Sequence, residues 1–597
     1  MRKLICLLFV TALLLAAPPA WAQKGAGQKG GGAGKRAVEL SITSPSAVDA
    51  KCALARLLAE GEVTSPAMLS QVESFAARKG MFFPTAHLLT YYAEVPALVE
   101  ALMNRPAPIS QQLAAASLAC AALGDYLEAE KRTTLNSVAP EEDDSGAIMT
   151  GPKKGAKKKR NTGGLTIPVA LLTNKVAVTA ELALLAAAYT GASGVKEQVD
   201  TLPASGGLVG AKLLYYARTG APVTEGMVAA AFAPGGQAPV FIKTTGPELA
   251  SFELLLPKEA YACEALGLLK DGKYLKQLHP MLGHPDLRVQ MEAVRAIQKI
   301  ASHELLPFLQ AKLNTCEWPV LVDLCQALAA LPAKESVPPL LARLKKETGR
   351  FRLDVTYALS AIAGEQIGQE HKEWEAWWSK KGAEFKVDEA ASQAFRSKRR
   401  VQDIRVPDLG YFYSLRIYSD HFSYVVDSSN SMKGDKMDNL RSNLGSSIES
   451  LRPWVQFNIA DFGGLVAVMN HDALTKDKWR GKTYTREMTH SQGTRIYDAI
   501  EAAGGVKGVD TLLLLTDGAP VHGQINPWRD LYRAMTIMNR YRPLIISTVA
   551  FQPTDRAVIN LKHLANENHG QSVTTNEESS RKGRQIRQGH LVMKGEK

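Results

Sequence analysis

Three short oxygen-rich segments in the last third of the chain contain the residues best suited to chemistry. The candidate ligands are Asp427, Ser429, Ser431, Thr494 and Asp517. They offer only oxygen atoms, which are the ligands that Mg²⁺, Mn²⁺ and Ca²⁺ prefer in proteins. Asp, Ser and Ser alternate in the first segment, so three side chains of one tight loop can point to a common centre. We therefore predict a divalent-metal site.

Two of these segments directly follow apolar runs, residues 422–426 and 512–515, that have the character of buried strands. Open α/β sheets place their ligand sites at the carboxyl ends of strands. The two carboxylates balance the charge of a divalent ion, and Mg²⁺ usually retains waters, so an open coordination position is expected. The alternative is that these Asp and Ser residues only cap helices, as such residues often do.

The sequences DSSNS, GT and TDG, in this order, resemble the metal-ion-dependent adhesion site of von Willebrand factor A (VWA) domains, whose pattern is DxSxS, a Thr and an Asp. The resemblance covers roughly residues 420–575. It implies that Asp427, Ser429 and Ser431 are first-loop ligands, Thr494 the second-loop ligand and Asp517 the third-loop ligand. It also implies a protein partner whose acidic residue completes the coordination of the metal, Mg²⁺ or else Mn²⁺ or Ca²⁺. The loops expected to set specificity are Gly434–Asp438, Thr489–Thr494 and Ala519–Asn526.

Two other functions remain open. The metal could stabilise a structural or assembly scaffold without binding a partner. Metal-assisted hydrolysis is the enzymatic alternative, and it would need a nearby base. His522 is a better candidate for that base than His421, which stands at the start of its strand, but an exposed loop histidine is the preferred interpretation. The sequence contains no GxSxG, HExxH or GxxxxGK[ST] motif, and we expect a non-enzymatic protein.

Alternating strands and helices must position the site. Strands are expected at 422–427, 455–461, 464–469, 510–516 and 543–551, and helices at 435–451, 494–503, 527–540 and 555–567. This order predicts a doubly wound, Rossmann-like α/β domain at 420–575 with helices on both faces of a mostly parallel sheet. Residues 381–419 are expected to be a linker followed by a strand, Tyr411–Tyr418, that either pairs at a sheet edge or covers the entry to the domain.

The N-terminal and central parts have helical periodicity over residues 47–138, 168–257 and 258–380. In the last of these, Ala265, Ala296, Ala327 and Ala358 recur every 31 residues, each followed by Leu or Ile. Such a period predicts an α-solenoid. The segment HPDLRV, residues 284–289, resembles the turn and helix of HEAT repeats, although the period is shorter than usual. The solenoid could present an extended partner-binding face or only position the metal domain.

The N-terminus has the pattern of a secretory signal peptide over residues 1–22. Arg2 and Lys3 precede an apolar run, residues 4–17, and Ala20-Trp21-Ala22 fits a cleavage site. We expect an exported protein of the periplasm, cell envelope or extracellular medium, without a transmembrane segment in the mature chain. Residues 23–46 are a Gly/Lys-rich linker.

Three segments contribute much of the positive charge. The net charge of +12 owes much to a charged loop, residues 139–167, to Lys398-Arg399-Arg400 and to a basic tail, residues 576–597, that is expected to be disordered. A nucleic-acid surface on the charged loop is the alternative to a solvated loop. Because no aromatic residue interleaves its lysines, nucleic-acid binding is disfavoured. An apolar fraction of 46% and a charged fraction of 22% are those of an ordinary globular protein.

Cysteine usage indicates neither a disulfide framework nor a zinc site. Five cysteines remain beyond the signal peptide: Cys52, Cys120, Cys263, Cys316 and Cys325. An odd number cannot pair fully, and each lies within or beside an apolar helical pattern. Buried free thiols are therefore expected, and a bridge between Cys316 and Cys325 stays open.

Overall fold

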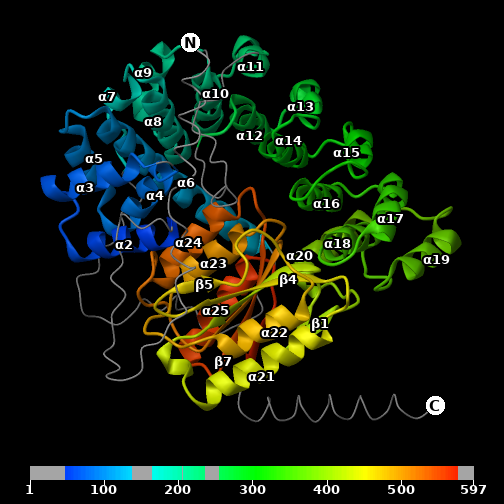
Figure 1. Ribbon diagram of the computed structural model, residues 1–597. Helices are drawn as coiled ribbons and strands as arrows, with labels where there is room; N and C mark the ends of the chain where they lie inside the picture. Colours follow the sequence, from blue (N-terminus) through cyan, green and yellow to red (C-terminus); the bar gives the residue numbers. More distant parts are fainter. Residues whose placement is uncertain (1–46, 79, 138–164, 205, 235–254, 576–597) are drawn as a thin grey trace, which may run out of the picture. The chain divides into compact units, whose positions relative to one another are not determined.

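The computed structural model describes residues 47–78, 80–137, 165–204, 206–234 and 255–575 (Figure 1). The predicted signal peptide, Gly/Lys-rich linker and basic tail, and most of the charged loop, lie outside these residues. Among the described helices, none is both long enough and apolar enough to cross a membrane.

The N-terminal described region is entirely helical. Its helices are α2 (Ala47–Glu60), α3 (Pro66–Ala76), α4 (Phe82–Tyr92), α5 (Val95–Met103), α6 (Pro108–Ser137), α7 (Val169–Leu172), α8 (Ala177–Thr190), α9 (Lys196–Thr201), α10 (Gly207–Thr219) and α11 (Glu225–Phe232). Helices α8 and α10 both end at a glycine in the left-handed conformation, Gly191 and Gly220, where a residue without Cβ stops a helix at least cost. The apolar residues of α6, α8 and α10 join one continuous core.

The central helices repeat, as the period of the sequence predicts. They are α12 (Lys258–Leu269), α13 (Leu275–Met281), α14 (Leu287–Ile300), α15 (Leu306–Lys312), α16 (Val320–Ala330), α17 (Val337–Lys346), α18 (Phe351–Ala363) and α19 (His371–Lys381). The recurring alanines are at most 1% exposed, and they lie on α12, α14, α16 and α18. Their small side chains let successive helices approach closely: a Cβ added to Gly267 would lie 2.8 Å from the Cα of Ala296.

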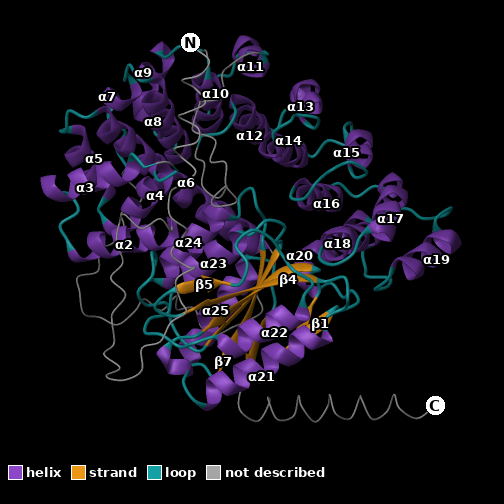
Figure 2. Cartoon of the chain, viewed as in Figure 1, coloured by secondary structure: helices purple, strands orange, loops and turns teal. Residues whose placement is uncertain are grey.

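A six-stranded sheet follows, in the order β5-β4-β3-β6-β7-β8. Figure 2 shows the strands in orange among the purple helices. The strands are β3 (His421–Asp427), β4 (Gln456–Phe462), β5 (Val466–Val468), β6 (Thr511–Thr516), β7 (Ile545–Phe551) and β8 (Ser572–Thr575). All pairs are parallel except β4 with β5. This is the predicted doubly wound α/β architecture, to which the structure adds β8 at one edge.

Both faces of the sheet are covered by helices, which explains why its strands are apolar on both sides. Helices α21 (Asp435–Ser450) and α22 (Lys478–Glu487) lie on one face, where Leu440 and Leu444 share a core with Tyr424 and Val426. Helices α23 (Ile496–Gly505), α24 (Trp528–Met538) and α25 (Asp555–Glu567) contribute to the core on the opposite face. Helix α22 was not predicted, because its sequence KWRGKTYTRE lacks an apolar stripe.

The strand expected at Tyr411–Tyr418 is a short hairpin instead. Strands β1 (Gly410–Phe412) and β2 (Leu415–Ile417) pair antiparallel with each other and form a separate two-stranded sheet. The first and last residues of each strand are buried and the middle one is exposed. Phe412 of β1 and Leu415 of β2 lie in the same core as residues of α21. The alternation therefore reflects packing against a helix and not pairing at the edge of the main sheet. A short helix, α20 (Glu389–Lys398), precedes the hairpin in the predicted linker.

Buried ion pairs join the helical repeats to the α/β domain. Arg540, just after α24, lies within reach of Glu264 of α12 and Glu292 of α14, at 2.7 and 3.3 Å. Arg533 of α24 pairs with Asp125 of α6, and near the N-terminus Lys51 Nζ lies 2.5 Å from Glu501 of α23. These contacts hold the helical regions against the α/β domain.

The cysteines are as expected from the sequence. Within the described residues, Cys52, Cys120, Cys263, Cys316 and Cys325 are all buried and free, so the possible bridge between Cys316 and Cys325 is not formed. Burial is the main cause that raises the pKa of each thiol, which keeps them protonated and unreactive.

Candidate metal centre

The carboxyl ends of β3 and β6 bring two of the predicted carboxylates to one place. Asp427 is the last residue of β3, and Asp517 follows the last residue of β6. The two strands are parallel neighbours, with Val426 opposite Leu515, so both chains leave the sheet at the same edge. Sequence position alone suggested this placement, and the register of the sheet produces it.

Four of the five predicted residues form one hydrogen-bonded network. The Asp427 carboxylate accepts from the backbone N–H of Ser429 at 2.7 Å. The hydroxyls of Ser429 and Ser431 lie 2.9 Å apart, and Ser431 donates to Asp517 Oδ1 at 2.8 Å. The alternating Asp and Ser side chains of the first loop therefore converge on the third-loop carboxylate, which an isolated capping role would not require.

Thr494, the fifth predicted residue, is attached to this network through its loop. The backbone N–H of Ser491 donates to Ser428 O at 3.0 Å, so the second loop runs beside the first. Thr494 and Val521 exchange two backbone hydrogen bonds of 2.8 Å, and Val521 lies in the loop that follows Asp517. Thr494 is 9% exposed. The second loop is therefore held between the other two, beside the four-residue network.

Burial makes the Asp427 carboxylate a strong candidate ligand. Asp427 has no exposed surface, and burial raises its pKa to about 6, with the nearby charge of Asp517 acting in the same direction. Hydrogen bonds from Ser429 and from Thr516, whose hydroxyl donates to Oδ2 at 2.5 Å, offset this only in part. A buried carboxylate without a full counter-charge is one that a cation would stabilise.

Lys436 is the residue at this site that the sequence analysis missed. It lies in the first turn of α21, and its Nζ is 2.7 Å from Asp517 Oδ2. The Lys436 side chain is 28% exposed, whereas that of Asp517 is 4% exposed. A lysine in the first turn of a helix is unfavourable next to the positive end of the helix dipole. This unfavourable placement of a positive charge is the sequence signal from which Lys436 could have been recognised.

The residues present fit a hard divalent cation. Asp427 and Asp517 supply two carboxylates, while Ser429, Ser431 and Thr494 supply neutral hydroxyls, a donor set typical of Mg²⁺, Mn²⁺ or Ca²⁺. The site is buried on the sheet side and opens outward at Ser431, which is exposed. These residues would hold the ion and leave one side accessible to a ligand.

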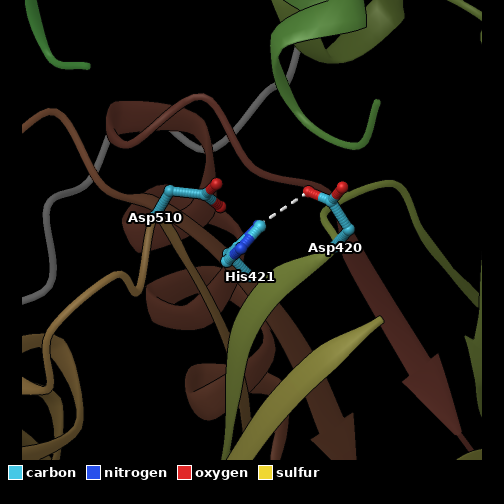
Figure 3. A group of neighbouring side chains, drawn as sticks. All are labelled: Asp420, His421 and Asp510. Atoms are coloured by element: carbon cyan, nitrogen blue, oxygen red, sulfur yellow. Dashed lines mark hydrogen bonds and ion pairs between the residues drawn. The ribbon is translucent and has the colours of Figure 1, made fainter. Parts of the chain in front are cut away.

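A second group of candidate ligands lies at the amino ends of the same two strands. Asp420, His421 and Asp510 each place one ligand atom within 4.8 Å of the others. Figure 3 shows these three neighbouring side chains. His421 begins β3 and Asp510 immediately precedes β6. Strand β3 has seven residues, so about 20 Å of strand separates this group from Asp427.

The contacts of this second group indicate an ion pair. His421 Nδ1 lies 2.9 Å from Asp420 Oδ1, and this hydrogen bond raises the pKa of His421. Thr348 donates to the other oxygen of Asp420 at 2.5 Å, and Ser419 donates to Asp510 at 2.6 Å. The raised pKa favours the protonated form of His421 beside Asp420, and the position of His421 at the start of β3 is far from the first site.

His522, the candidate base of the hydrolase alternative, is exposed and adopts a left-handed backbone with φ of 68°. It lies beside the second loop: a Cβ added to Gly493 would be 3.5 Å from the Cβ of His522. The structure therefore places this imidazole near the mouth of the site, at the surface.

The sheet order and the network at its carboxyl edge define the class of the C-terminal region. Five parallel strands and one antiparallel edge strand, with helices on both faces, form a doubly wound α/β domain that is similar to von Willebrand factor A domains. The helices before it include HEAT repeats: residues 258–324 match the family described as HEAT repeats.

Curated relatives match a short part of the chain. Inter alpha-trypsin inhibitor heavy chain 4 of Mus musculus is 28% identical over 139 residues, which is 20% of this chain and 15% of that protein. Inter-alpha-trypsin inhibitor heavy chain H4 of Sus scrofa is 30% identical over 117 residues, 17% of this chain and 13% of that protein. The chain thus covers well under two thirds of either relative.

Solved structures with a similar fold include a von Willebrand factor type A protein from Catenulispora acidiphila. That similarity has 16% identity and a TM-score of 0.25, and it covers 29% of this chain and 43% of the other. Another is the vWF domain of the type V pili tip protein Mfa5 from Porphyromonas gingivalis, at 13% identity and a TM-score of 0.23. It covers 28% of this chain and 95% of that domain.

Proposed function

We propose that this chain is an exported protein that binds a protein partner through a divalent-metal site at the carboxyl edge of its VWA-type sheet. The ligands are Asp427, Ser429, Ser431, Thr494 and Asp517. The observation that carries the proposal is the single network that joins Asp427, Ser429, Ser431 and Asp517. A VWA-type domain supports a role in protein interaction.

An acidic side chain is the partner group that this chemistry favours. A bound Mg²⁺, Mn²⁺ or Ca²⁺ supplies Lewis acidity toward an incoming carboxylate. Asp427 and Asp517 together neutralise the ion, while Lys436 leaves one positive charge beside it. A carboxylate from the partner would cancel that charge. Val521 is 45% exposed in the third loop and offers an apolar contact next to the acidic one.

The helical repeats act in this proposal as a scaffold that fixes the metal domain. Arg540, Arg533 and Lys51 all form their ion pairs between the repeats or N-terminal helices and the α/β domain. The surface of the helical array that contacts the α/β domain is covered and cannot also bind a partner. The same contacts support the second candidate, a structural or assembly component in which the metal only stabilises the domain.

We infer further that the chain is not an enzyme. A hydrolase would need a base positioned against the metal's ligand, and His522 is an exposed loop residue. Turnover of a substrate that disappears in Asp427→Ala would contradict this inference. The proposed export depends on the signal-peptide pattern of residues 1–22, and detection of a chain beginning at Gln23 would test it.

Calorimetric titration of Mg²⁺, Mn²⁺ and Ca²⁺ into the full chain tests the metal site. Asp517→Ala is the matched variant, because it removes one carboxylate at a position just after β6 and changes no strand residue. Saturable binding that is lost in Asp517→Ala supports the proposal. Absence of binding to the folded wild type contradicts it.

The partner is then sought by capture on immobilised protein, with and without Mg²⁺ and with Asp517→Ala as a control. A partner retained only by the metal-loaded wild type supports metal-dependent binding. If the metal binds but any retained partner is held equally without it, the scaffold function is favoured.

A further inference from the structure

We propose that Lys436 is a built-in counter-ion that competes with the divalent cation for Asp517 and so sets the metal affinity of the site. This inference rests on the proposed metal-binding function and concerns its regulation. The finding behind it is the Lys436 Nζ–Asp517 Oδ2 contact of 2.7 Å. The ammonium thus occupies one oxygen of a predicted ligand carboxylate.

The two oxygens of Asp517 have different neighbours. Oδ1 accepts from the Ser431 hydroxyl at 2.8 Å and so belongs to the network of the first loop. Oδ2 accepts from Lys436 at 2.7 Å. Because the Asp517 side chain is only 4% exposed, water cannot replace the lysine at low cost, and the ammonium is the charge partner of this buried carboxylate.

The position of Lys436 in its helix indicates that this ion pair compensates for an unfavourable site. Helix α21 starts at Asp435, directly after Gly434, whose φ of 72° produces the turn between the first loop and the helix. A cation in this first turn meets the positive end of the helix dipole, whereas Asp435 and Asp438 are favourable there. The carboxylate of Asp517 is the feature that makes a lysine acceptable at this position.

A divalent cation and this lysine cannot use Asp517 equally well at once. An ion bound to the Asp517 carboxylate would lie close to the Lys436 ammonium. Both are positively charged, and their repulsion is strong where little water screens it. The ion must therefore displace Lys436 or bind with reduced affinity. Once displaced, the ammonium remains tethered to α21 and adds positive charge at the mouth of the site.

Metal titration of the full chain with charge-matched variants tests this proposal. Lys436→Gln keeps a hydrogen-bond donor of similar length but removes the charge. Lys433→Gln is the control, because Lys433 is exposed in the same segment and its replacement changes the net charge equally. We expect Lys436→Gln to bind Mg²⁺ and Mn²⁺ about tenfold more tightly than the wild type at low ionic strength, and Lys433→Gln to stay within about twofold.

The outcomes separate this proposal from the metal site itself. Wild-type binding that is lost in Asp517→Ala, with no tighter binding in Lys436→Gln, overturns the role of Lys436 and leaves the site standing. Binding by Lys436→Gln and not by the wild type supports competition by the lysine and overturns the metal-dependent function proposed for the wild type. If neither the folded wild type nor folded Lys436→Gln binds any of the ions, both the metal site and the role of Lys436 are overturned.

Amine labelling of the wild type gives a second readout that needs no variant. The reaction of Lys436 with acetic anhydride is measured by mass spectrometry with and without Mg²⁺, and Lys433 is the internal reference. We expect labelling of Lys436 to rise about threefold or more with the ion, because the amine leaves the Asp517 carboxylate and becomes more accessible to the reagent. Unchanged or slower labelling contradicts displacement.

Discussion

Arg540 of the VWA-type domain and Glu264 of the first HEAT-like helix form a buried ion pair with 2.7 Å between Nη2 and Oε2. The side chain of Arg540 is 9% exposed and that of Glu264 is 3% exposed. Tyr189 of α8 lies 3.2 Å from Nη1, and Glu292 of α14 shares the guanidinium. One arginine therefore connects three helices of the array to the α/β domain.

Arg540→Ala should destabilise the protein by about 3–5 kcal/mol. The substitution leaves Glu264 and Glu292 buried without their cation, and an unpaired buried charge is costly. Chemical denaturation measures the loss, and limited proteolysis shows whether the α/β domain separates from the repeats. Arg529→Ala is the control, because Arg529 is exposed on the neighbouring helix. Equal stability of the two variants would show that the ion pair does not hold the domains together.

Mg²⁺ should raise the melting temperature of the wild type and leave that of Asp427→Asn unchanged. An ion that binds only the folded chain stabilises it by about 2.7 kcal/mol at a hundred times its dissociation constant. Asp510→Asn is the informative comparison, since Asp510 belongs to the second cluster. Mg²⁺ should raise the melting temperature of Asp510→Asn as much as that of the wild type. An increase that is lost in Asp510→Asn but kept in Asp427→Asn would show that the metal binds at the amino edge of the sheet instead.

Glu181 should make the stability of the helical region depend on pH. It is 4% exposed, and its Oε1 has no hydrogen-bond partner among the described residues. Burial raises its pKa from 4.5 to about 7. The folded state then binds more protons than the unfolded state between these values, so the free energy of unfolding falls as pH rises from about 4.5 to 7.

Glu181→Gln removes this titration. The variant should exceed the wild type by about 1–3 kcal/mol in the free energy of unfolding at pH 8, and the difference should shrink toward pH 5. Urea denaturation at both pH values measures it. If the difference in free energy of unfolding does not change with pH, the Glu181 carboxyl group does not have the raised pKa expected from its burial.

Two glycine substitutions should have opposite effects because their surroundings differ. A Cβ on Gly267 would lie 2.8 Å from the backbone of Ala296, whereas nothing lies within 4 Å of one on Gly445 in α21. Gly267→Ala should therefore destabilise the repeats by about 1–3 kcal/mol, and Gly445→Ala should stabilise the protein by about 0.5–1 kcal/mol. Thermal unfolding compares them. Stabilisation by both would show that α12 and α14 can move apart freely.

Local pattern was sufficient to predict most of the elements. The apolar runs before Asp427 and Asp517 required buried parallel strands, and the 31-residue period of the alanines required stacked helices. Asp427, Ser429, Ser431 and Asp517 could be named because the carboxyl ends of neighbouring parallel strands meet at one edge, whereas Thr494 was assigned its place by the resemblance to the adhesion-site pattern. Helix α22 and strand β8 were missed, because α22 lacks an apolar face and β8 is a short edge strand with little apolar character.

Only the tertiary structure decided which distant residues act together. The docking of Arg540 against Glu264 and Glu292 joins segments hundreds of residues apart, and no local periodicity encodes such a pairing. Lys436 looks from the sequence like one more surface lysine. It becomes the charge partner of Asp517 because β6 ends beside the start of α21, and charge acts through space at a distance that the order of residues does not record.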